Sequence, residues 1–193
     1  MCFAIPTESA AAPIVLDFGT SVAAEGKVRV HQINQTPVPD GWLLDHKGQP
    51  TNDPSVLYQT PAGSILPLGG NQSYKGFGLA LVLDILAGGL SGGQCSRPGA
   101  PPARGNNVFC LVLDPDSFLG CNRLKRQATE LAEYVRATPR APGVDVLFLP
   151  GDIERFRHDD RMSHGVTLEQ NHWLMLSSLA ARLGVTVPIT TLA

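Results

Sequence analysis

The sequence GGNQSYKGFGLALVLDIL, residues 69–86, decides the fold prediction because a glycine-rich turn runs directly into an apolar helix. Glycine lets a backbone approach a ligand closely and adopt positive φ at little steric cost. The start of the following helix offers unpaired N–H groups and the positive end of the helix dipole. Tyr74 and Lys75 stand at this junction. The segment therefore predicts either a cradle for an anionic cofactor or an ordinary loop that leads into a buried helix.

Two common phosphate-binding motifs do not fit this segment. A Walker A loop needs Gly-Lys followed by Ser or Thr, whereas the chain reads Lys75-Gly76-Phe77. Gly76 and Gly78 resemble the start of a dinucleotide fingerprint, but the third glycine is missing and no strand leads into the turn. A Rossmann fold is therefore not expected.

A second segment, APIVLDFGTSVAAEGKVRV (residues 12–30), begins with a short apolar run at residues 14–16 that predicts a buried strand ending at Asp17. A turn of small residues follows, and the alternation from Lys27 to Val30 predicts a second strand. The carboxylate of Asp17 could accept hydrogen bonds from ribose hydroxyls, or it could cap its own turn. Both interpretations stay open.

Four blocks, taken in order, resemble the malate/L-lactate dehydrogenase family. They are LDFGTSVAAEGK (16–27), PDGWLLDHKGQPTNDPSVL (39–57), LPLGGNQSYKGFGLALVLDILAGGLSG (66–92) and FLPGDIERFRHDDRMSHGVTL (148–168). This non-Rossmann group includes ureidoglycolate, sulfolactate and diketogulonate oxidoreductases and an imine-reducing piperideine-carboxylate branch. The resemblance extends over essentially all 193 residues. It implies an α/β fold of mixed layers, and hydride transfer between NAD or NADP and a small 2-oxo or 2-hydroxy acid.

The family's cofactor contacts match three short segments of the chain. Its Asp-Met-Ala-Thr-Ser turn matches residues 17–21, its aromatic-Lys-Gly turn matches residues 74–76, and its Pro-Gly-x-Glu loop matches residues 150–153. Phe18 and Gly19 replace the family's Met and Ala, and Ile153 stands where an acidic residue is common. The resemblance implies that the cofactor-binding residues are Asp17, Phe18, Gly19, Thr20, Tyr74, Lys75, Gly151, Asp152 and Ile153.

The family's catalytic residues have no match in the chain. They are the histidine of a Ser-His-Gly motif, which handles the proton, and a nearby arginine, which holds the substrate carboxylate. Reduction of a ketone needs both a proton donor and a cation. The resemblance starts at about Cys2, within the family's pattern, so we expect an N-terminally truncated chain. We interpret Ser163-His164-Gly165 as a coincidental match, because it follows the Pro-Gly loop.

We expect one partial oxidoreductase region over residues 1–193, with a mixed α/β cofactor-binding part over residues 1–150 and a helical part over residues 151–193. The helical part would pack on the missing catalytic segment. If that segment is absent, part of the apolar surface on residues 79–86 and on the last helix would be bare. The family's homodimer would cover it. The alternative is a catalytically silent nucleotide-binding or interaction module.

Further elements follow from the pattern. Apolar runs predict strands at residues 108–113 and 144–149, and helices are expected from about residue 74 to 87 and along the stripe that includes Leu124 and Leu131. A capping box at residues 167–170 predicts the start of the last helix.

Composition excludes several classes of protein. A net charge of −2 with 15 basic residues argues against a nucleic-acid partner. No apolar run reaches about 18 residues without interruption, so no membrane span is expected. The histidines and four cysteines lack zinc-ligand spacing, so we expect no metal. The N-terminus shows no secretory signal, and we expect a cytoplasmic protein with reduced thiols.

Overall fold

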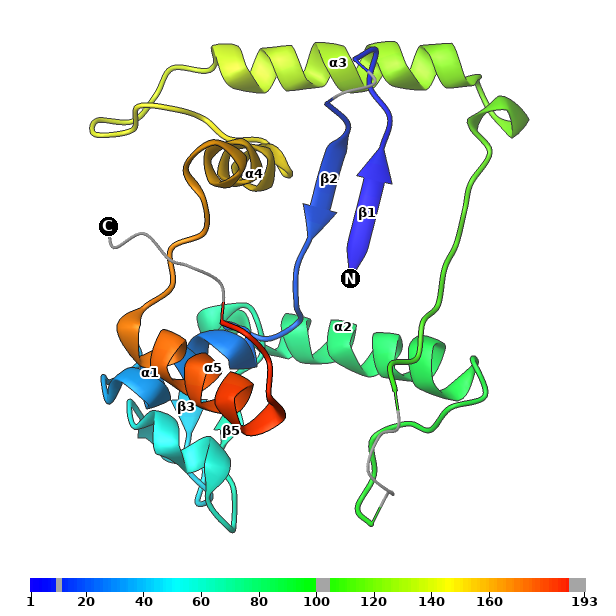
Figure 1. Cartoon of the computed structure of the whole chain (residues 1–193). Coiled ribbons are helices and arrows are strands. Elements are labelled where there is room, and N and C mark those ends of the chain that lie inside the picture. The colour runs from blue at the N-terminus through cyan, green and yellow to red at the C-terminus, as the bar shows by residue number, and fades with distance from the viewer. Residues whose placement is uncertain (10–11, 100–104, 188–193) are drawn as a thin grey trace. The chain divides into compact units, whose positions relative to one another are not determined.

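A computed structural model describes residues 1–9, 12–99 and 105–187 (Figure 1). The chain forms two compact units, one made of residues 1–20 and 74–158 and the other of residues 21–73 and 159–193. Helices and short antiparallel sheets occur together, which confirms a mixed α/β fold. The division at residue 150 stays a prediction.

The first unit is built on a β-hairpin. Strands β1 (Cys2–Ile5) and β2 (Ile14–Asp17) pair antiparallel, with Cys2 opposite Asp17 and Ile5 opposite Ile14. The predicted strand at residues 14–16 is therefore confirmed, but its predicted burial is wrong, because Ile14 and Val15 are only half-buried and Leu16 is exposed. The helices of this unit are α2 (Tyr74–Asp84), its π-helical extension η3 (Ile85–Gly89), the 3-10 turn η4 (Pro115–Ser117), α3 (Cys121–Ala137) and the first part of α4 (Asp152–His164).

Helix α3 is amphipathic, as its sequence predicts. Its buried residues are Ala128 and Ala132, whose small side chains let the helix approach its neighbours closely. The main-chain N–H of Glu8 donates to the Thr129 hydroxyl at 3.1 Å. This contact places α3 on the loop that follows β1.

The second unit has its own small core. It contains α1 (Glu25–Asn34), the 3-10 turns η1 (Pro54–Tyr58) and η2 (Gly70–Gln72), α5 (Gln170–Leu183) and a three-stranded antiparallel sheet ordered β4 (Pro50–Thr51), β3 (Leu43–Leu44), β5 (Ser64–Ile65). Val28 from α1, Val38 and Leu43 are almost fully buried and form the core, against which Trp42 and Ile65 pack.

The predicted strand from Lys27 to Val30 is wrong, because these residues lie within α1. Arg29 pairs with Glu25, one helical turn earlier, at 2.9 Å. Side chains at i and i+4 are neighbours on the surface of a helix, whereas in an extended strand they lie too far apart to pair. Val28 is the buried residue of α1, so the short alternation did not indicate a strand with one buried face.

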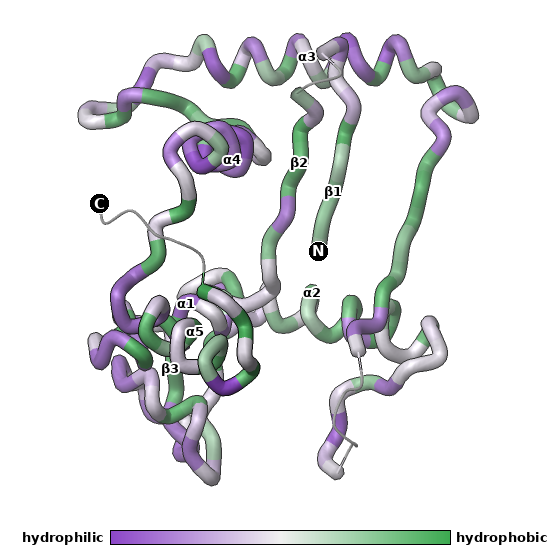
Figure 2. The backbone as a smooth tube through the Cα atoms, viewed as in Figure 1, coloured by the Kyte–Doolittle hydropathy of each residue, from purple (hydrophilic) through white to green (hydrophobic). Residues whose placement is uncertain are grey.

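The predicted strands at residues 108–113 and 144–149 are also wrong. Neither segment has regular secondary structure, and neither has a ladder partner among the described residues. Most of their apolar side chains are exposed, and Val112 reaches 85%, whereas Leu147 and Leu149 are half-buried. Figure 2 shows a hydrophobic stretch in the chain that leads up to α3. A strand exists only where a neighbour supplies hydrogen bonds.

Helix α2 begins at Tyr74 as predicted, but the expectation that it is buried on several sides is wrong. Phe77, Leu81, Val82 and Ile85 are each more than half exposed. The bare apolar surface expected on residues 79–86 is therefore present. In the described ranges, no helix is long and apolar enough to cross a bilayer.

The last two helices differ from expectation at their ends. The residue preceding α5 is Glu169, and no side chain caps this helix, so the predicted capping box at residues 167–170 is wrong. Helix α4 lies within the helical part expected over residues 151–193, but its own bounds were not predicted. Its sequence is dominated by charged residues, as Figure 2 shows, so no apolar period marks it as a helix.

Candidate functional site

The first candidate segment is the turn that follows β2. The main-chain N–H of Phe18 donates to the Met1 oxygen at 3.0 Å, and the Met1 ammonium donates to the Phe18 oxygen at 2.9 Å. These bonds hold the turn at the end of the hairpin. The exposed carboxylate of Asp17 makes no hydrogen bond or ion pair with any described residue. The capping interpretation of Asp17 is therefore wrong, and its oxygens remain able to accept from a ligand.

The second candidate segment is the start of α2. Gly69 has φ +121°, and a Cβ there would lie 2.8 Å from the Gln72 oxygen, so the tight turn requires glycine. Lys75 is exposed, and its ammonium lies 5.9 Å from the centroid of the Tyr74 ring. Its charge is not neutralised by a carboxylate within the described part of the chain.

The third candidate segment, the Pro-Gly loop, lies directly against β2. The main-chain N–H of Val15 donates to the Pro150 oxygen at 3.1 Å. Gly151 is buried with φ +95°, and a Cβ there would meet both the N and the O of Val15 at 3.3 Å. Asp17 lies two residues further along the strand, about 7 Å away. The structure thus joins the third segment to β2, the strand whose last residue is Asp17.

The carboxylate of Asp152 organises this loop. It accepts from the Leu149 N–H at 2.8 Å, from Arg136 at 3.1 and 3.2 Å, and from Arg155. Its side chain is only 15% exposed. Burial acts to raise the pKa of the Asp152 carboxyl, but the hydrogen bonds from Leu149 and the two arginines outweigh it, so this pKa lies below its usual value. Asp152 therefore already has protein partners for its charge.

Sequence reasoning missed Arg136 and Arg155. Arg155 follows Asp152 by three residues, a spacing that places both on one helix face, so it could have been found. Arg136 lies 16 residues before Asp152, and no local pattern links them. Ile153 is 40% exposed and offers only its main chain to a polar ligand.

The candidate segments are not all joined. Asp17 is the last residue of β2, and residues 18–20 follow it. The Gly151–Ile153 segment contacts the same strand at Val15, through Gly151. Within the described chain, no hydrogen bond or ion pair links Tyr74 or Lys75 to the first or the third segment.

A cavity of about 200 Å³ lies beside the Pro-Gly loop. Leu149 and Arg155 line it, together with Glu133 and Arg136 from α3. Thr7 and Thr129 add hydroxyl groups to its wall. We call this the α3 cavity.

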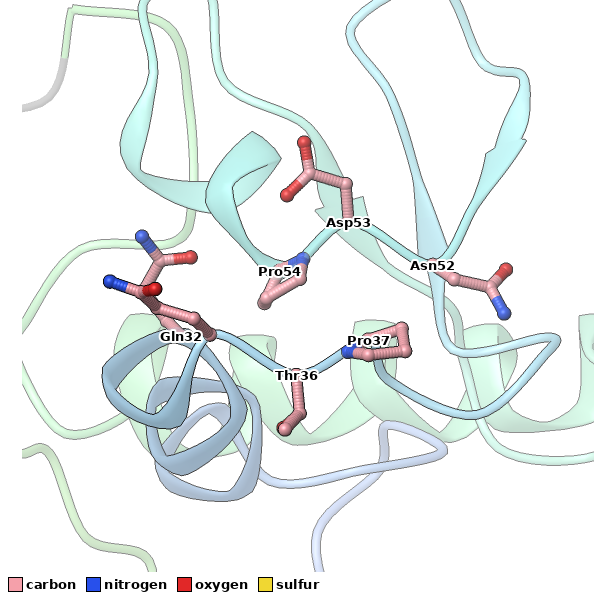
Figure 3. Close-up of a pocket in the computed structure, with 7 residues that line it drawn as sticks. Gln32, Thr36, Pro37, Asn52, Asp53 and Pro54 are labelled. Atoms are coloured by element: carbon pink, nitrogen blue, oxygen red, sulfur yellow. The ribbon is translucent and has the colours of Figure 1, made fainter.

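A second, larger cavity of about 440 Å³ lies in the other unit, between the end of α1 and the start of η1 (Figure 3). Amide side chains such as Gln32 and Asn52 line it. Its acidic residue, Asp53, already accepts from the Ser55 N–H at 2.9 Å and the Ser55 hydroxyl at 2.7 Å. No cation lines this cavity, so it does not match an anionic cofactor.

The Ser163-His164-Gly165 sequence lies on the surface. His164 is the last residue of α4, its side chain is 77% exposed, and its Nδ1 lies 2.9 Å from Asp160. The Ser163 hydroxyl donates to the main-chain oxygen of Asp159. Within the described ranges, no group of three or more potential ligand side chains could hold a metal ion.

The donor set fits a nicotinamide dinucleotide. Such a cofactor carries ribose hydroxyls, which can donate hydrogen bonds to a free carboxylate such as that of Asp17. It also carries an anionic pyrophosphate, which an unpaired ammonium such as that of Lys75 can attract. Gly151 gives the chain a close approach to β2 in the same region.

Comparison with known proteins agrees with this chemistry. A family model described as malate/L-lactate dehydrogenase matches residues 1–177. An L-lactate dehydrogenase of Cupriavidus necator is 35% identical over 97% of this chain and 53% of its own length. A hydroxycarboxylate dehydrogenase B of Escherichia coli is 33% identical over 90% of this chain and 48% of its own length. The chain spans about half the length of the curated relatives it matches.

Solved structures show the same fold. The malate dehydrogenase of Pyrococcus horikoshii matches 96% of this chain and 51% of its own, with a TM-score of 0.75 and 26% identity. A Δ1-piperideine-2-carboxylate reductase of Pseudomonas syringae matches 93% and 52%, with a TM-score of 0.68 and 29% identity. With the family model matching most of the sequence, the chain belongs to the malate/L-lactate dehydrogenase family.

Proposed function

We propose that this chain supplies the nicotinamide-cofactor site of an oxidoreductase that transfers a hydride between NAD(P)H and a small 2-oxo or 2-hydroxy acid. The observation that carries the proposal is the close contact of Gly151 with Val15, two residues from the unpaired carboxylate of Asp17. The names of the relatives, lactate, malate and hydroxycarboxylate dehydrogenases, support the same reaction class.

Each candidate residue would bind a different part of the cofactor. Asp17 would accept from ribose hydroxyls, Lys75 would attract the pyrophosphate, and the Gly151–Ile153 main chain would border the remainder. Phe18, Gly19, Thr20 and Tyr74 would shape the surface around it. The bound nicotinamide supplies the hydride. The family's histidine and arginine, which would handle the proton and the substrate carboxylate, have no match among these 193 residues.

The assembly we propose is a cytoplasmic homodimer. The side chains of Phe77 and Leu81 on α2 and of Ile85, the first residue of η3, form an exposed apolar stripe at helical spacing, which we call the α2 stripe. Apolar surface of this kind is typical of a contact between proteins. The alternative to an active enzyme is a silent nucleotide-binding module, in which the same site binds cofactor without turnover.

The test is to titrate the 193-residue chain with NADH and NADPH by fluorescence, and then to follow absorbance at a reduced-nicotinamide wavelength with the 2-oxo acids related to lactate and malate. Binding with turnover would support an active oxidoreductase. Binding without turnover would support the cofactor site and favour the silent alternative for the isolated chain. Failure to bind either cofactor would overturn the proposal.

A further inference from the structure

The α3 cavity adjoins the Pro-Gly loop, but only part of its lining has a structural task. Leu149 and Arg155 belong to the network around Asp152, and the Thr129 hydroxyl accepts from the Glu8 N–H. Ala132, only 6% exposed, adds an apolar group to the lining. The remaining polar groups face a space with room for part of a ligand.

The charged side chains that line this cavity differ in whether they already have a partner within the protein. Arg136 and Arg155 both bind the Asp152 carboxylate, and Arg155 also donates to the Pro13 oxygen at 3.0 Å. Glu133 also lines the cavity, yet its carboxylate makes no hydrogen bond or ion pair within the described part of the chain. The cavity therefore offers an uncommitted acceptor in Glu133, while the guanidinium groups of its two arginines both donate to the single carboxylate of Asp152, which balances one of their two charges.

We propose that Glu133 makes this chain selective for NAD over NADP by accepting hydrogen bonds from the ribose diol of the cofactor's adenosine half. The inference rests on the proposed function, because it assumes that the cofactor extends along β2 past Gly151. A carboxylate binds a ribose diol well and repels a 2′-phosphate, whereas an available arginine does the reverse. The fold need not be a Rossmann fold for this charge rule to hold.

The alternative is that Glu133 is an ordinary solvated residue of α3. Glu130 provides the matched control, since it lies on the same helix but outside the cavity, where it accepts from Gln127 at 2.9 Å. Both residues are exposed acids, so a general effect of removing one negative charge from α3 would appear in both variants.

The experiment measures dissociation constants of NADH and NADPH for the unmodified chain and for Glu133→Gln, Glu133→Arg and Glu130→Gln, by fluorescence titration. We expect Glu133→Gln to weaken NADH binding about tenfold, the size of a lost hydrogen bond to a charged group. NADPH affinity should stay equal or improve. Glu133→Arg should favour NADPH, and Glu130→Gln should leave the ratio of the two constants unchanged.

The outcomes separate this inference from the proposed function. If the unmodified chain binds NADH and neither Glu133 variant changes the ratio of the two constants, the inference is wrong while the cofactor site stands. An equal change of the ratio in Glu130→Gln would also overturn it, because the effect would then be one of net charge. If the unmodified chain binds neither cofactor, both proposals fall together.

Discussion

Arg155 donates a hydrogen bond to the main-chain oxygen of Pro13, a residue 142 positions earlier in the chain, at 3.0 Å. The same guanidinium pairs with Asp152. One side chain therefore fixes both the start of α4 and the approach to β2. This link holds Gly151 against Val15, where the Pro-Gly loop meets the strand.

Replacing Asp152 by Asn should lower the free energy of unfolding at pH 7 by about 2 kcal/mol, because two guanidinium groups lose their charged partner. The pKa of Asp152 is lowered in the folded chain, so its contribution is present above the unfolded value of about 3.9 and is lost as the pH falls through the folded value. As the pH falls from 5 through the folded pKa of Asp152, the free energy of unfolding should decrease more for the unmodified chain than for Asp152→Asn. Urea unfolding across this range measures it, and parallel curves for the two proteins would contradict the assigned network.

Replacing Gly151 by Ala should destabilise the chain through two effects. Its φ of +95° strains any L side chain, and a Cβ there would meet Val15 and the Arg155 guanidinium at 3.2 to 3.3 Å. Gly143→Ala is the control, because its φ is +80° but nothing lies within 4 Å. We expect the free energy of unfolding to fall by about 1 kcal/mol in the control and by about 2 kcal/mol or more in Gly151→Ala, as measured by thermal or urea unfolding. Equal losses would show that the contact with β2 has little energetic value.

Replacing Phe77 by Ser should weaken self-association if the α2 stripe forms the homodimer contact. The side chain of Phe77 is 59% exposed and apolar, so its loss removes interface area without opening a buried core. Tyr134→Ser on α3 removes a side chain that is 73% exposed and serves as the control. Sedimentation velocity of the 20.5 kDa chain measures the association. An unmodified chain that sediments as a monomer would contradict the dimer itself.

The sequence predicted the elements whose signal is local. Residues 14–16 carry a compact apolar run, and residues 121–137 carry a helical stripe with Ala128 at its centre, so β2 and α3 were found. The segment from Lys27 to Val30 was too short to distinguish a two-residue period from a helical one, and Arg29 pairs with Glu25 across a helical turn.

The rest depends on partners that local sequence does not contain. Residues 108–113 have the composition of a buried strand, but no neighbouring strand supplies a ladder in the described structure. At the candidate site, the contact of Gly151 with Val15 spans more than a hundred residues, and the resemblance gave both segments but not their contact. The ion pairs of Asp152 with two arginines could likewise not be predicted from the local sequence, because Arg136 lies on a separate helix.

The most direct measurement is the affinity of the chain for NADH, compared among the unmodified protein, Lys75→Ala and Asp17→Ala, with the exposed Lys47 of the other unit changed to Ala as the control. Fluorescence titration should show binding to the unmodified chain, with each of the first two variants about tenfold weaker because a charged partner is lost. Lys47→Ala should bind like the unmodified chain. Unchanged affinity in both Lys75→Ala and Asp17→Ala would contradict the cofactor site that we propose.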